Sequence, residues 1–137
     1  MINSINSVKL RSILPNKTHI EFDRENVSSG DADVKLTIQA DFSDKKSTED
    51  KLCKLTLSAT AEAVNDKDVT FAELTFTVDY IFDIVDKESY GKLSDDEKTC
   101  ICSNLAYMDY RRKLLTAMST VAMSSIKLPL SLQDLMS

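Results

Sequence analysis

Residues 73–84 read ELTFTVDYIFDI, and apolar side chains occupy every second position along this stretch. Leu74, Phe76 and Val78 share one parity, whereas the opposite parity carries mainly Thr and Asp. Side chains of a β-strand point alternately to two faces, so this pattern predicts a strand with one buried and one solvated face. The stretch therefore predicts a sheet that covers a core on one side only.

Two further stretches alternate in the same way, VKLTIQADF at residues 34–42 and CKLTLSATAEA at residues 53–63. Short connections between the three stretches favour antiparallel pairing. Residues 8–23 alternate less regularly around Pro15, which is typical of an edge strand that is bent and broken near the proline. In this strand Ile20 and Phe22 are expected to point inward. The chain up to residue 84 thus predicts four antiparallel strands.

From Ser94 the spacing of the apolar residues changes to that of a helix. Ser94 and Glu97 have the spacing of a capping box, and neither Pro nor Gly follows until Pro129. Residues 95–125 are therefore expected to form one long helix. Pro129 predicts an extended link over residues 126–130, and a short terminal helix is expected over residues 132–136.

The long helix carries two apolar stripes on different faces. The stripe that we expect to cover the sheet comprises Ile101, Leu105, Met108, Leu115, Met118 and Ala122. The other stripe is expected to meet a second subunit, because a four-stranded monomer offers it no partner. Its members are Tyr107, Tyr110, Leu114, Ala117 and Val121, with Arg112 as an ion-pairing neighbour at the same contact. The two stripes therefore predict a homo-oligomer.

The composition limits the functions that the chain can have. Its 137 residues are expected to form a single domain, residues 1–137. A net charge of -5 argues against nucleic acid as a ligand. A single histidine, His19, and two glycines argue against a zinc site, a histidine-based triad and a glycine-rich phosphate loop. We therefore expect no enzymatic activity, no cofactor and no bound metal.

The cysteines and the apolar runs predict a compartment. Cys53, Cys100 and Cys102 cannot all pair within one chain, and the first residues do not resemble a signal peptide. No apolar run approaches the roughly 20 residues that span a bilayer. The expectations are reduced cysteines, a cytoplasmic location and no insertion into a membrane.

The order of these elements and several short motifs resemble the SecB protein-export chaperone family. The similar segments are DVKLTI at residues 33–38, YIFDI at 80–84, YRRKLLTAM at 110–118, and LPL at 128–130 followed by LQDL at 132–135. The resemblance spans about residues 8–136. It implies an α+β fold, in which a four-stranded antiparallel sheet is followed by a long helix and a short C-terminal helix.

The resemblance also implies a function. An assembly of two dimers would bind unfolded polypeptides without ATP. This binding would keep preproteins competent for translocation. The alternative is a SecB-like chaperone dedicated to a toxin–antitoxin system or to another single protein partner. A domain that binds a small ligand is a third option.

Candidate sites follow from the same resemblance. A groove for client segments is expected beside the sheet, and its candidate residues, unless they form ordinary tail packing, are Val27, Leu128, Leu130, Leu132, Leu135 and Met136. Asp23 and Glu73 are candidates for a contact with the export motor SecA, since Asp23 matches an acidic position of the family. Two other acidic positions of the family hold His19 and Thr75 here. An antitoxin is the alternative partner.

Overall fold

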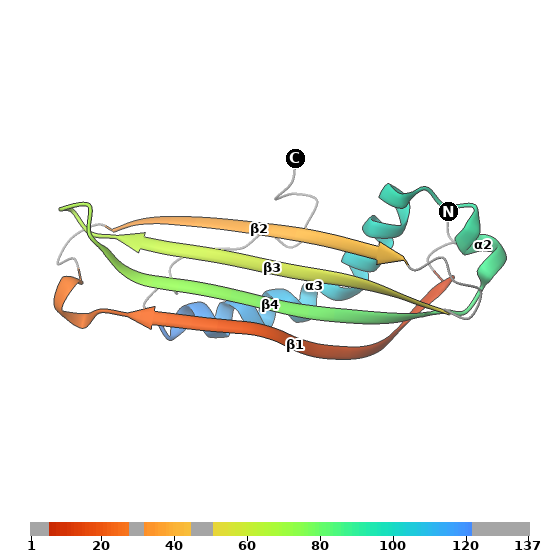
Figure 1. Ribbon diagram of the computed structural model, residues 1–137, viewed down its shortest axis with the longest axis horizontal. Helices are drawn as coiled ribbons and strands as arrows, with labels where there is room; N and C mark the ends of the chain where they lie inside the picture. The colour runs from red at the N-terminus through yellow and green to blue at the C-terminus, as the bar shows by residue number, and fades with distance from the viewer. Residues whose placement is uncertain (1–5, 28–31, 45–50, 122–137) are drawn as a thin grey trace.

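Four long strands form one antiparallel sheet in the computed structural model, which describes residues 6–27, 32–44 and 51–121 (Figure 1). The strands are β1 (Val8–Phe22), β2 (Asp33–Asp44), β3 (Leu52–Val64) and β4 (Thr70–Ile84). They are ordered β1-β4-β3-β2 across the sheet, so β1 and β2 form its edges. The predicted four antiparallel strands are therefore confirmed.

Helices follow the sheet in the chain. The 3-10 helix η1 (Arg24–Asn26) comes directly after β1, and the short α2 (Lys87–Gly91) and the long α3 (Asp95–Ser119) come after β4. The capping box of α3 is present as predicted, since Glu97 N donates to Ser94 Oγ at 3.1 Å and Ser94 N donates to the Glu97 carboxylate at 3.0 Å. The α+β fold is confirmed, whereas the predicted link and terminal helix at residues 126–136 lie outside the described residues.

The helix α3 crosses one face of the sheet diagonally, from the β2 edge to the β1 edge (Figure 1). We call this covered face the inner face. It carries the fully or nearly buried apolar side chains of the two central strands, among them Leu55, Leu57, Ala59, Ala61, Leu74, Val78, Tyr80 and Phe82. None of the described helices has the length and the hydropathy of a membrane span.

The edge strand β1 is continuous, so the predicted break near Pro15 is wrong. Its pairing with β4 shifts register between Leu10 and Ser12 and again between Pro15 and Lys17. Each such bulge adds one residue and moves the following side chains to the other face. Leu14 consequently lies on the outer face and is 49% exposed. The two bulges explain why alternation in this part of the sequence is irregular.

The tyrosine stripe of α3 is buried within the chain, and part of the stripe that we expected on the sheet is exposed. The residues expected to lack a partner within the chain are at most 2% exposed, namely Tyr107, Tyr110, Leu114 and Val121. Leu105 and Met108, which we expected on the sheet, are 41% and 53% exposed. The reason for placing the tyrosine stripe at a subunit contact is therefore wrong.

Tyrosine hydroxyl groups account for this orientation. The Tyr110 hydroxyl donates to the main-chain oxygen of Phe76 at 2.7 Å, and the two rings stack with centroids 5.6 Å apart. From the sheet, the Tyr80 hydroxyl donates to Asp109 of α3 at 2.9 Å. Burial raises the pKa of both tyrosines, so both hydroxyls stay protonated and act as donors. Buried hydroxyls need such partners, and this orientation of α3 gives each hydroxyl a partner on the other element.

The two remaining residues of the predicted subunit contact differ in exposure. Ala117 is half-buried, and Arg112 is exposed and pairs with Asp109 of the same helix at 3.1 Å. From the stripe expected on the sheet, Ile101 and Met118 are indeed buried. The surface that α3 leaves uncovered is therefore built around Leu105 and Met108.

Leu114→Ala tests this orientation of α3. We expect it to lower the free energy of unfolding by about 2–5 kcal/mol, because it removes fully buried methyl groups and leaves a cavity. The matched control Leu14→Ala changes the same kind of side chain on the exposed outer face of the sheet and should cost less than about 1 kcal/mol. Urea unfolding measures both values. Equal losses, or a larger loss for Leu14→Ala, would contradict the orientation.

Candidate functional site

Exposed apolar side chains gather at the end of the sheet where β1 ends and β4 begins. Ile20, Phe22, Val27 and Val69 are each 40–44% exposed, and we call this group the apolar corner. A cluster of exposed apolar side chains is typical of an interaction surface. The apolar corner is therefore the first candidate for a binding site.

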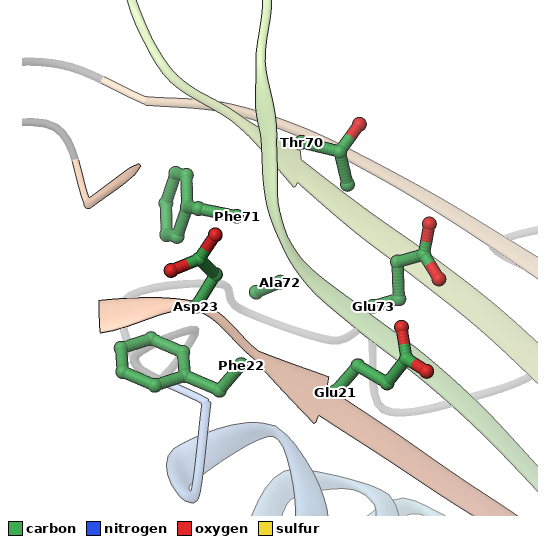
Figure 2. A pocket seen from close by; sticks show the side chains of 7 residues that line it. All are labelled: Glu21, Phe22, Asp23, Thr70, Phe71, Ala72 and Glu73. Carbon is green, nitrogen blue, oxygen red and sulfur yellow. The ribbon is translucent and has the colours of Figure 1, made fainter. Parts of the chain in front are cut away.

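A cavity of about 400 Å³ opens at the apolar corner. It is lined by the seven residues shown in Figure 2, Glu21, Phe22, Asp23, Thr70, Phe71, Ala72 and Glu73. The rings of Phe22 and Phe71 meet edge to face with centroids 6.4 Å apart, which gives the cavity an apolar wall. Glu21 and Glu73 lie close together on the side of β1 opposite Phe22 (Figure 2). The cavity thus has an apolar wall and an acidic rim.

Hydrogen bonds hold this end of the sheet in shape. Asp23 caps η1, because its carboxylate accepts from Glu25 N at 3.1 Å, and Asp23 N donates to Phe71 O at 2.7 Å. In the turn between β3 and β4, the Asn65 side chain accepts from Val69 N at 2.9 Å. The same side chain donates to Asn26 O at 2.9 Å and so ties the turn to η1. The cavity is therefore largely formed before any partner binds.

Three glutamates lie side by side on the outer face of the sheet next to this cavity. Glu73 of β4 is directly opposite Glu21 of β1 and Glu62 of β3. His19 Nε2 lies 3.4 Å from Glu21, and the ligand atoms of His19, Glu21 and Glu73 all lie within 4.8 Å of one another. His19, Glu21 and Glu73 are all exposed, and exposed acidic groups are common without a bound metal. The row concentrates negative charge, which favours a basic partner.

The structure brings some of the predicted site residues together. Asp23 and Glu73, the candidates for a SecA contact, line the same cavity. His19 and Thr75, which the sequence resemblance aligns with acidic positions of the SecB family, face each other across β1 and β4. Of the predicted client groove, Val27 lies at the apolar corner, whereas Leu128, Leu130, Leu132, Leu135 and Met136 lie outside the described residues.

Sequence reasoning missed Ile20 and Phe22 as site residues. Their inward parity is confirmed, because they pair with Leu74 and Ala72 of the inner face. Their exposure was not predicted, because parity shows which face a side chain is on and not whether that face is covered. The signal that could have predicted their exposure is the position of β1 at the edge of the sheet, which one helix covers least completely.

No protein-family model matches the sequence, and no curated protein matches it. Among solved structures, the chain is similar to Rv1957, a SecB-like chaperone of Mycobacterium tuberculosis in complex with a ChAD peptide from the Rv1956 HigA1 antitoxin. That match has a TM-score of 0.66 and 14% identity, and it covers 94% of this chain and 93% of the other. This chain has the SecB-like fold.

The low identity makes this a divergent example of the SecB-like fold. A second similar structure is a protein of unknown function from Streptococcus agalactiae, with 14% identity over 90% of this chain and 96% of that chain. Its TM-score of 0.39 is too low to support any conclusion.

Proposed function

We propose that this SecB-like chain is a chaperone that binds an unfolded segment of another protein at the apolar corner, without ATP and without enzymatic activity. The observation that carries the proposal is a SecB-like fold over 94% of the chain whose described part leaves Ile20, Phe22 and Val27 exposed beside a preformed cavity. Residues 128–136, with Leu128, Leu130, Leu132, Leu135 and Met136, are proposed to complete the groove.

The binding physics fits a chaperone of this kind. Unfolded chains expose apolar side chains, and burial of apolar surface contributes roughly 25 cal/mol per Å². A protein that binds only the unfolded state lowers the concentration of free unfolded chain and so opposes aggregation by mass action. The Phe22 ring, half-exposed and already placed against Phe71, offers apolar surface without much loss of conformational freedom on binding.

We favour a chaperone dedicated to one partner, such as an antitoxin, over a general chaperone for preproteins in export. The similar Mycobacterium tuberculosis chaperone was solved with an antitoxin peptide. A SecA contact here would depend on Asp23 and Glu73, because His19 and Thr75 stand at two positions that are acidic in the SecB family. The acidic rim also favours a particular client, in which basic residues flank an apolar side chain. Such a partner would be met in the cytoplasm.

Self-association is the second part of the proposal. Leu105 and Met108 lie on the face of α3 that points away from the sheet of the same chain, with the partly buried Leu115 on the same side. An apolar stripe on an otherwise charged helix is suited to a second copy of the chain. This surface replaces the tyrosine stripe as the proposed subunit contact, and two dimers are expected to associate.

Substitution of the apolar corner tests the chaperone proposal. The double substitution Ile20→Ser with Phe22→Ser should lower the suppression of aggregation of a heat-denatured model protein at least tenfold, because it removes most of the proposed contact surface. Light scattering at increasing ratios of chaperone to model protein measures the effect. Circular dichroism confirms that the variant is folded.

The matched control changes two apolar residues that are at least as exposed and lie away from the apolar corner. Leu14→Ser with Val85→Ser should keep the activity of the wild type. Equal loss of activity in both double variants, or unchanged activity in both, would contradict the placement of the binding site.

The mass in solution tests self-association. At micromolar concentration we expect light scattering to give a mass well above the 15.3 kDa of one chain. Leu105→Asp with Met108→Asp should lower this mass, because buried carboxylates without partners oppose association. Thr37→Asp with Gln39→Asp adds the same charge on the exposed outer face of β2 and should leave the mass unchanged. A wild type of 15.3 kDa would contradict this part of the proposal.

A further inference from the structure

Two pairs of side chains, one buried and one partly buried, lie between the first part of α3 and the sheet. Asp44 of β2 and Cys53 of β3 are opposite each other in the strand pairing. Lys98 and Cys102 are one helical turn apart on α3, so their side chains point in similar directions. Lys98 Nζ lies 3.2 Å from the Asp44 carboxylate, and the Cys53 and Cys102 side chains are buried in the same apolar core. Each pair thus joins one residue of α3 to one residue of the sheet, and the two pairs lie next to each other.

Tyr90 of α2 holds this arrangement in place. Its hydroxyl donates to the Asp44 carboxylate at 2.8 Å, and Lys98 Nζ lies 4.4 Å from the centre of its ring. The Lys98 and Asp44 side chains are only 11% and 16% exposed, so their ion pair is weakly screened by solvent. The turn of α3 that carries Cys102 is therefore fixed above Cys53 by contacts that do not involve sulfur.

We propose that Cys53 and Cys102 form a redox modification site, which low-molecular-weight disulfides such as oxidised glutathione convert into a disulfide between β3 and α3. The Asp44–Lys98 ion pair, one strand across from Cys53 and one helical turn from Cys102, holds the two cysteines next to each other, so a disulfide needs only a limited displacement. Both thiols are nearly fully buried, with 3% and 1% exposure. Reaction therefore requires brief local opening of α3, which makes the modification slow and dependent on the stability of the helix contact.

The chemistry proceeds by two thiol–disulfide exchanges. The Cys53 thiolate attacks one sulfur of oxidised glutathione, the glutathione S–S bond breaks, and one glutathione thiolate leaves. Cys102 then loses its proton to water, and its sulfur attacks the Cys53 sulfur of the mixed disulfide and displaces the second glutathione. Overall, two protein thiols are oxidised and one oxidised glutathione is reduced to two glutathione thiols.

The interaction between the two thiols shifts their pKa values in opposite directions. It lowers the pKa of Cys53, although burial opposes this shift. The same interaction, together with burial, raises the pKa of Cys102. Since the thiolate is the nucleophile, Cys53 is the sulfur that reacts first. Asp44 and Lys98 are the charged groups that act on the Cys53 thiol.

Cys100 provides a matched control within the same helix. It lies two positions before Cys102 on α3, so it points to a different side, and it is partly exposed. The Asn104 side chain lies within hydrogen-bonding distance of its sulfur at 3.8 Å. Accessibility alone would therefore select Cys100 for oxidation, whereas the geometry selects Cys53 and Cys102.

The test incubates the whole protein with oxidised glutathione and maps its peptides by mass spectrometry without reduction. We expect a product about 2 Da lighter than the reduced chain, with a peptide linked between Cys53 and Cys102, in the wild type and in Cys100→Ala. Cys102→Ala should not form it. Closing a loop of about 50 residues should also raise the unfolding midpoint by about 10 °C, and reduction should reverse the shift.

Several results would overturn the proposal. They are glutathione adducts without the internal link, a link that involves Cys100, and thiols that stay reduced at every ratio of oxidised to reduced glutathione. The peptide map of the wild type decides between these results even if Cys102→Ala does not fold. None of the results depends on chaperone activity.

Discussion

One helix cannot cover the apolar face of four long strands, and most features of this structure follow from that mismatch. At about 4.8 Å between strands and 3.4 Å per residue, the sheet is roughly 19 Å by 50 Å. The 25 residues of α3 form a rod about 37 Å long and 10 Å wide. Lying diagonally, α3 covers most of the inner face of the central strands β3 and β4. At the edges, the apolar residues of β2 are half-buried and Ile20 and Phe22 of β1 are exposed.

The same mismatch gives the proposed function its physical basis. A chain that leaves part of its apolar face open must either associate or bind other chains. The apolar corner combines this open surface with a rim of carboxylates, because Glu21 and Glu73 lie on the outer face of the strands that carry Phe22 and Phe71. Apolar contact supplies affinity, whereas the carboxylates attract basic segments and increase their rate of association.

Patterns along the chain predicted the elements well and their environments poorly. Alternation in β2, β3 and β4 and the capping box of Ser94 and Glu97 are local signals, and the structure confirms them. Orientation of α3 was not predicted, because both of its stripes are apolar and the partner of the Tyr110 hydroxyl is a main-chain oxygen distant in sequence. Exposure of Phe22 and the contact between Cys53 and Cys102 depend on how far and at what angle α3 crosses the sheet. No local pattern encodes that angle.

Hydrogen–deuterium exchange with and without a permanently unfolded model protein tests the central claim most directly, since it reports on the uncovered part of the inner face without any substitution. The account predicts slower exchange of main-chain amides in residues 18–27 and 69–73 when the unfolded protein is bound. Exchange in the covered part of β3, residues 53–59, should not change. Protection confined to β2, at the opposite edge of the sheet, would contradict the account. So would no protection anywhere although the unfolded protein binds.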